Sequence, residues 1–168
     1  LHGCGMALDT VDNLTVQREG DATGKGAFPT ARLTGYGAVL WFLGNEGSKH
    51  DAFNRRERAL ITSYLEGGGR ILVSGAETGW DLVAQRELQE EEAFFHEVLR
   101  ADYLHDDAGT YRVAGRAGTI FEGLALELDD GSHGTYAVDY PDVLAPRGGS
   151  HAILDYQGGR GGAAGAST

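Results

Sequence analysis

The stretch from Tyr36 to Leu82 constrains the fold of this chain more than any other. It opens with an unbroken apolar run at residues 38–43, which is typical of a strand buried on both faces. A second apolar strand is expected to begin at Arg70, and the sequence between the two strands has the pattern of an amphipathic helix. Two strands joined by a crossover helix predict a parallel sheet.

The ends of this helix are marked in the sequence. Asn54 followed by Glu57 matches a capping box in which Asn replaces the usual Ser or Thr. The glycines at 67–69 provide the left-handed residue that closes a helix. Helical spacing places Arg58 on the outer, polar face. The residues predicted to face the sheet are Leu60, Ile61, Tyr64 and Leu65.

The same stretch indicates where a ligand would bind. In open parallel sheets, ligands bind beyond the carboxyl ends of the strands. Here those ends lead into residues 44–51 and 74–81, which carry polar side chains. We therefore expect the functional groups of this chain in these two loops.

The motif YxxVLWFLG, followed by a capped helix and YLEGGGRILVSGAETGWDL, resembles the class I glutamine-amidotransferase-like superfamily. Within it, the chain is most similar to flavodoxin-like modules of secreted bacterial hydrolases and peptidases, relatives of the trehalose-utilisation-like domains. The resemblance covers residues 7–157. Catalytic members carry a Cys nucleophile on the turn after the second strand, where this chain has Ser74. Because the only cysteine is Cys4, the resemblance does not imply amidotransferase activity here.

The expected fold is a three-layer α/β domain with a mainly parallel, flavodoxin-like sheet and some antiparallel β structure near the C-terminus. The resemblance requires a central strand before the first helix, and only residues 1–5 are available for it, so the sheet is expected to be truncated at both ends. Residues 6–13 allow a short helix, and the alternation at 14–18 predicts a strand. Residues 1–157 are expected to form one domain.

The two ends of the chain are expected to contribute little to that domain. Residues 1–5 are expected to be frayed or non-native, and the start at Leu1 suggests a processed or excised fragment. Residues 158–168 are rich in glycine and are expected to form a flexible tail.

The composition excludes several classes of function. A net charge of -11 argues against nucleic acid as a partner, because phosphates require a basic surface. No apolar run is long enough for a membrane span, and one cysteine cannot supply a Cys-rich zinc site. We expect no cofactor. The resemblance implies an extracellular or periplasmic location as part of a larger protein, although this chain shows no signal peptide.

Two catalytic arrangements are open. Ser74 could act as a nucleophile in a triad with His151 and an acid, Glu77 or Asp81, because triads are defined by geometry and not by order in the chain. The alternative is a hydroxyl that only satisfies a backbone group at the end of a strand.

The second arrangement is a carboxylate pair. Glu46, Glu77 and Asp81 lie in the two strand-end loops, and paired carboxylates are the minimum for glycoside hydrolysis. Trp80 offers a face on which a sugar ring can stack, and Asn45 completes the expected ligand-binding set with Glu46. Chance proximity is the competing interpretation in a chain with 25 acidic residues.

A metal site is conceivable at His105, Asp106 and Asp107, since imidazole and carboxylates bind divalent ions. Consecutive residues rarely chelate one ion without other ligands. An exposed loop between a helix and a strand accounts for the same residues.

Two functions from different classes follow. The first is a non-catalytic accessory or ligand-binding module that accompanies a secreted hydrolase and takes a small-molecule or carbohydrate ligand. The second is a small hydrolase, a glycosidase, esterase or amidase, that uses Ser74 or the Glu77 and Asp81 carboxylates beside Trp80. In either case we expect a homo-oligomer, because a missing central strand leaves a sheet edge that another chain can cover.

Overall fold

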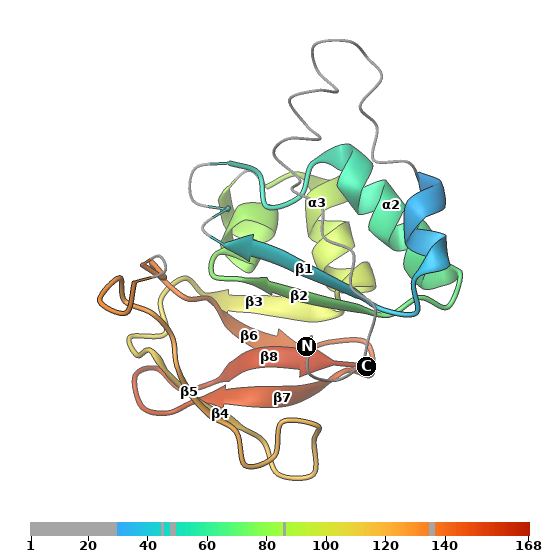
Figure 1. The fold of residues 1–168 in the computed structure, drawn as a ribbon. Helices are drawn as coiled ribbons and strands as arrows, with labels where there is room; N and C mark the ends of the chain where they lie inside the picture. Colours follow the sequence, from blue (N-terminus) through green and yellow to red (C-terminus); the bar gives the residue numbers. More distant parts are fainter. Residues whose placement is uncertain (1–29, 45, 48–49, 86, 135–136) are drawn as a thin grey trace.

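A computed structural model describes residues 30–44, 46–47, 50–85, 87–134 and 137–168. The helix predicted at 6–13, the strand predicted at 14–18 and the expected fraying at 1–5 lie outside these residues. Figure 1 shows helices at one end of the molecule, a pair of strands in the middle and a larger sheet at the other end. No described helix has both the length and the apolar character required to cross a lipid bilayer.

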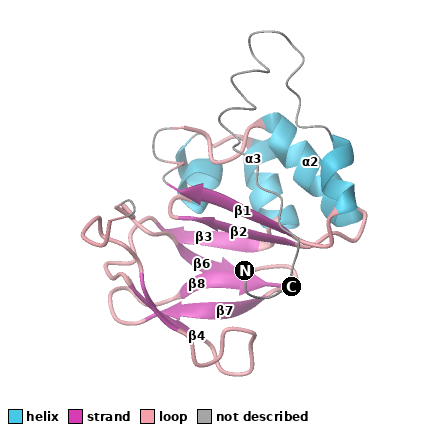
Figure 2. Ribbon diagram, in the orientation of Figure 1, coloured by secondary structure: helices cyan, strands magenta, loops and turns pink. Residues whose placement is uncertain are grey.

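The helical elements of the described chain are η2 (Thr30–Gly35, a 3-10 helix), α2 (Arg55–Glu66), η3 (Trp80–Gln85, a π-helix), α3 (Gln89–Ala93) and η4 (Phe94–Val98, a π-helix). The strands are β1 (Val39–Gly44), β2 (Ile71–Gly75), β3 (Ala101–His105), β4 (Arg112–Gly115), β5 (Ala125–Glu127), β6 (Val143–Pro146), β7 (His151–Tyr156) and β8 (Ala163–Ser167). Figure 2 distinguishes helices, strands and loops by colour.

The predicted strand–helix–strand unit is confirmed. β1 and β2 pair in parallel, with Val39 opposite Ile71. At the start of α2, Asn54 Oδ1 accepts hydrogen bonds from the N–H groups of Arg56 and Glu57, and the Asn54 N–H donates to Glu57 Oε2 at 2.8 Å, which completes the capping box. At the other end Gly68 has a φ of 86°, the left-handed conformation that favours glycine.

The described helices cover one face of the parallel pair, and Leu40 and Phe42 on the other face are exposed, so the expected burial of β1 on both faces is wrong. Trp41 and Leu43 are buried against Phe53, Ile61 and the helical layer. The alternate side chains of β1 and β2 point to the other face and are exposed. These are Leu40, Phe42, Leu72 and Ser74.

The three-layer, mainly parallel flavodoxin-like fold is also wrong. Among the described strands, six form an antiparallel sheet in the order β3-β6-β8-β7-β4-β5, and β1 and β2 alone form a parallel sheet. The physical reason lies in the connections. A parallel neighbour requires a crossover of a dozen or more residues, whereas short connections such as 157–162, between β7 and β8, allow antiparallel pairing. The antiparallel structure expected near the C-terminus is therefore the larger part of the sheet structure.

The glycine-rich end of the chain differs from the flexible tail predicted for residues 158–168. Residues 163–167 form β8, which lies between β6 and β7 in the interior of the antiparallel sheet. Its small side chains allow close packing: a Cβ on Gly162 would overlap Val143, and one on Gly165 would touch Leu154 at 3.5 Å. A strand without large side chains carries no hydrophobic alternation, so its sequence resembles that of a flexible segment.

Candidate functional site

The loops that follow β1 and β2 meet, as the parallel arrangement predicts. The Ala52 N–H donates a 2.8 Å hydrogen bond to Asp81 Oδ2. Gly47 lies so close to the second loop that a Cβ there would be 2.9 Å from the carbonyl oxygen of Glu77, and its φ is 105°. Only glycine meets both conditions without strain. The first loop is therefore held against the start of η3.

A third segment, which the sequence analysis did not include, completes this junction. Asp142 precedes β6, and its Oδ2 accepts hydrogen bonds from the N–H groups of Gly79 at 2.6 Å and Trp80 at 3.3 Å. The Asp142 N–H donates to the carbonyl of Ala76 at 3.0 Å. One carboxylate thus joins the parallel pair to the antiparallel sheet. We call Glu77, Tyr103, Asp106 and Asp142 the acidic junction.

The carboxyl group of Asp142 is enclosed. Its side chain is buried, and its Oδ1 has no hydrogen-bond partner within the described part of the chain. Burial raises the pKa of Asp142 to about 8, against the opposing effect of the Gly79 and Trp80 N–H donors, while the charges of Asp106 and Glu77 raise it further. The group therefore holds a proton near neutral pH.

The other members of the junction respond to the same surroundings. Burial and then the charges of Asp142, Asp106 and Glu77 raise the pKa of Tyr103 to about 12. Burial, followed by the neighbouring charge of Asp107, raises the pKa of Asp106 above its ordinary value. The junction consequently disfavours further negative charge.

The predicted serine triad does not assemble. Ser74 is exposed on the uncovered face of β2, opposite Phe42 in the register, whereas Glu77 and Asp81 are buried. His151 begins β7, where it pairs with a residue of β8 in the antiparallel sheet. The four predicted catalytic residues thus belong to different surfaces or to the interior.

The predicted ligand-binding set is only partly described. Asn45 lies outside the described residues. Glu46 is half-buried, and its N–H donates to the carbonyl of Leu43 at 3.1 Å. Trp80 is half-buried at the first position of η3, next to Asp81, and π-helical turns occur often at functional sites. Trp80 is therefore a partly accessible aromatic group beside this junction.

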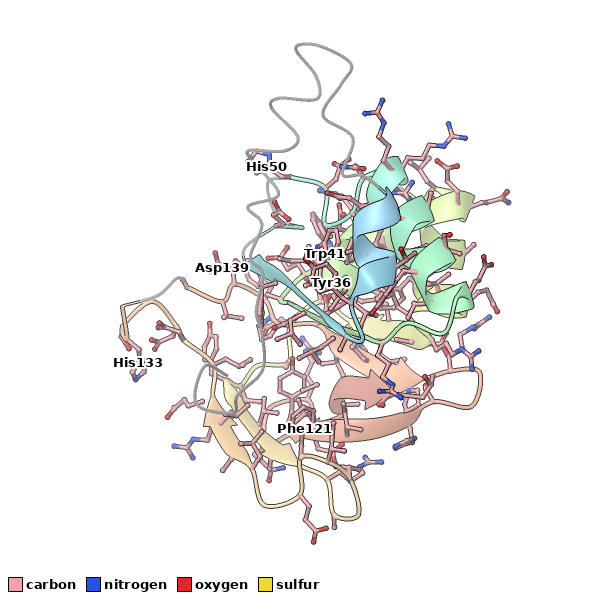
Figure 3. All side chains as sticks on the ribbon, turned by 45° about the vertical axis from the view of Figure 1, so that its right-hand side comes forward. Tyr36, Trp41, His50, Phe121, His133 and Asp139 are labelled. Atoms are coloured by element: carbon pink, nitrogen blue, oxygen red, sulfur yellow. The ribbon has the colours of Figure 1, made fainter. Side chains whose placement is uncertain are left out.

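The predicted metal ligands lie at the end of β3. His105 and Asp106 are exposed, and Asp107 Oδ1 accepts a 2.7 Å hydrogen bond from the Gly109 N–H, which forms a local turn. Within the described residues, the ligand atoms of Asp129, Asp130 and His133 do lie within 4.8 Å of one another. Figure 3 shows His133 at the outer end of a loop, away from Trp41.

This second cluster is explained by its own turn. Asp129 Oδ1 accepts from the N–H groups of Gly131 and His133, and Asp130 Oδ1 accepts from the Ser132 N–H. The His133 side chain is 63% exposed. These contacts shape the loop without requiring an ion.

A groove of about 340 Å³ lies between α2 and the α3–η4 segment, on the helical side of the molecule. None of the predicted site residues lines it. Its lining residues are Arg55, Arg58, Ala59, Thr62, Glu90, Ala93, Phe94, Glu97 and Val98. The junction and this groove are therefore separate features.

Arg58 lies at the base of this groove and is buried, which corrects its expected place on the outer face of α2. Its Nη1 donates to Glu91 Oε1 at 2.8 Å and to the carbonyl of Phe53 at 2.6 Å. We expect Arg58→Met to reduce the free energy of unfolding by about 3 kcal/mol, because Glu91 is left buried and charged without a partner. Urea denaturation measures this loss.

The matched control is the double variant Arg58→Met with Glu91→Leu. Replacing both partners of a buried ion pair by apolar groups is often neutral, so most of the lost stability should return. A double variant that is as unstable as the single one would contradict this explanation.

Two residues of the junction, Tyr103 and Asp142, are not predicted from the sequence, and neither is Tyr140, two positions before Asp142. Tyr140 is 59% exposed and has a φ of 46°, a conformation that is rare for a bulky residue. Such strain is concentrated at functional sites. The only local signal is the Tyr-Pro-Asp sequence at residues 140–142, which is equally typical of a turn at the end of a strand.

Comparisons with models of known protein families, with curated proteins and with solved structures found no match to this chain.

Proposed function

We propose that this chain is a non-catalytic binding module, an accessory to a secreted hydrolase, and that it binds a carbohydrate beside the acidic junction through Trp80 and Tyr140. The observation that carries the proposal is the strained and exposed Tyr140. It lies two residues before Asp142, whose carboxylate holds the backbone of Trp80. The backbone of Trp80 is thus held by a carboxyl group that lies two positions after Tyr140 in the chain.

A pair of aromatic side chains beside polar groups can bind a sugar. The apolar face of a pyranose ring stacks on an aromatic ring, and the surrounding polar groups fix its orientation. The net charge of -11 favours neutral over acidic sugars, because an anionic ligand would be repelled.

The burial of the predicted catalytic acids supports binding over hydrolysis. Asp81 is 1% exposed and accepts a hydrogen bond from the Ala52 N–H, so it cannot reach a substrate without a rearrangement of both loops. Ser74 is on another face, and His151 is on β7.

A hydrolase is the second candidate, and one observation favours it. Asp142 has a pKa raised to about 8 by burial, and a carboxyl group that holds its proton at neutral pH can act as a general acid. Glu77, whose charge contributes to that shift, is then the natural second carboxylate.

An array of neutral and acidic oligosaccharides tests the first candidate, followed by calorimetry on any sugar retained. We expect Trp80→Ala and Tyr140→Ala each to weaken binding by about tenfold or more, as for other aromatic anchors. Tyr111→Ala is the matched control, since Tyr111 is 37% exposed and lies beside β4. Binding that is unaffected by both changes would refute the proposed site.

A broad hydrolase substrate screen tests the second candidate with the same protein. Turnover that disappears in Glu77→Gln would assign a hydrolase and overturn the non-catalytic proposal. The absence of turnover, together with aromatic-dependent sugar binding, would support the module.

A further inference from the structure

Asp142 links the antiparallel sheet to the backbone that carries Trp80. Its Oδ2 accepts from the N–H groups of Gly79 and Trp80, while its own N–H donates to the carbonyl of Ala76. Gly79 packs closely over this contact, since a Cβ there would be 3.1 Å from Asp142 Oδ2 and 2.9 Å from Tyr103 Cδ2. The backbone at residues 79 and 80 is therefore held directly on the carboxyl group.

The ionisable groups that interact with this carboxyl group are acids and phenols from three parts of the fold. They lie before η3, on β3 and in the loop after it, and on β7: Glu77, Tyr103, Asp106 and Tyr156. On η3, the Asp81 carboxylate accepts from the Ala52 N–H of the other loop. On β3, His105 pairs in the register with Val143, the residue after Asp142. Within the described residues, no basic side chain is among the charges that act on Asp142.

The ionised form of Asp142 is poorly accommodated in these surroundings. The Gly79 and Trp80 N–H donors favour the charge, but burial outweighs them, and no described donor contacts Oδ1. Water around the carboxylate would reduce the cost of burying it. Water can enter only if the carboxylate and the backbone at residues 79 and 80 separate.

We propose that Asp142 is a positioning residue: its protonated carboxyl group holds Trp80 in place for the sugar, and its ionised form releases Trp80. The inference rests on the proposed function, because it concerns the regulation of the same site. A neutral sugar has no group that ionises near neutral pH, so a pH dependence of its binding would arise in the protein. Asp142 acts through the backbone of Trp80 and does not need to touch the sugar.

Fluorine NMR of the chain labelled with 5-fluorotryptophan tests the release without any sugar. The chain has two tryptophans, Trp41 and Trp80, and Trp80→Phe assigns their signals. We expect the Trp80 signal to change with a midpoint at the pKa of Asp142, about 8, and the Trp41 signal to stay constant, because Trp41 is buried in the core. A constant Trp80 signal would overturn the proposal.

The variant Asp142→Asn should abolish the change in the Trp80 signal, because an amide does not ionise in this range. Asp139→Asn and His105→Gln are matched controls that should retain it, since Asp139 is exposed in the same loop and His105 lies beside Val143. A Trp80 signal that still changes in Asp142→Asn would overturn the proposal. So would a loss of far-UV circular dichroism with the same midpoint, which would assign the change to global unfolding.

Calorimetry with a neutral oligosaccharide retained by the array tests the effect on binding. With a pKa of about 8, about one molecule in ten keeps the Asp142 proton at about pH 9, so Kd should be about tenfold higher there than at about pH 6. In Asp142→Asn, Kd should be the same at both pH values. Equal Kd values in the wild type would overturn the inference while leaving the proposed function intact.

The two experiments together separate the inference from the proposed function. If no sugar binds at any pH while the Trp80 signal titrates as expected, the proposed function fails. The dependence of the Trp80 position on the Asp142 proton is then still supported.

Discussion

The free energy of unfolding is expected to fall as the pH rises from about 4 to about 8. The pKa of Asp142 is raised from 3.8 to about 8 in the folded chain. Between these values the Asp142 carboxyl group is ionised in the unfolded chain and protonated in the folded chain. Each unit of pH therefore lowers the free energy of the unfolded state relative to that of the folded state. At 1.36 kcal/mol for each pKa unit, the loss is on the order of 5 kcal/mol.

The groups around Asp142 do not reverse this direction. Glu77 and Asp106 oppose its ionisation by their charge. Burial, and then the charge of Asp142, raise the pKa values of Tyr103 and Tyr156, and these phenols titrate above the pH range concerned. The stabilising contribution of Asp142 is therefore complete below about pH 4 and absent above about pH 8.

Chemical denaturation at a series of pH values measures the effect. Asp142→Asn resembles the protonated acid, since its amide oxygen can accept from the Gly79 N–H, so its stability should be nearly independent of pH between 4 and 8. Asp139→Asn is the matched control, because Asp139 is exposed in the same loop. If the free energy of unfolding depended on pH in the same way in the wild type and in Asp142→Asn, the pH dependence could not be assigned to Asp142.

Phe53→Ala is expected to reduce the free energy of unfolding by about 4 kcal/mol. Phe53 is fully buried, with its ring centroid 5.7 Å from that of Trp41 and 5.4 Å from that of Phe94. Removing it would leave a cavity between the parallel pair and the helices. Rigid strands and helices on both sides prevent the collapse that would fill it.

The matched control for this cavity is Ile120→Ala, because Ile120 is 85% exposed. The free energy of unfolding of Ile120→Ala should stay within about 0.5 kcal/mol of the wild-type value. A loss for Phe53→Ala as small as that of the control would mean that the packing of Trp41 and Phe94 does not depend on the phenyl ring between them.

The part of the fold that sequence predicts well is encoded locally. Asn54 and Glu57 are three residues apart, and Gly68 follows its helix directly, so each signal acts within one turn. The pairing of β8 with β6 and β7 joins residues without such a signal, since Ala and Gly side chains carry no periodic pattern. The apolar run of β1 does not reveal that Leu40 and Phe42, on one of its faces, are exposed.

In the candidate site too, the features that depend on local sequence are predicted and the long-range contacts are not. The meeting of the two strand-end loops follows from parallel pairing and was expected at 44–51 and 74–81. Asp142 approaches Gly79 from 63 positions along the chain, which no local pattern indicates. Arg58 was placed on the solvent side because helical spacing gives the face and not the partner. Its partner, Glu91, belongs to a separate helix.

The position of β8 between β6 and β7 determines when the six-stranded sheet can form during synthesis of the chain. Because β8 separates β6 from β7, the β3–β6 pair has no hydrogen-bonded ladder to the β4, β5 and β7 group until residues 163–167 are made. A nascent chain can complete its parallel pair and α2 early, since both depend on sequence neighbours. The six-stranded sheet closes only after these last strand residues leave the ribosome. Until then, β6 and β7 each present an edge to other chains.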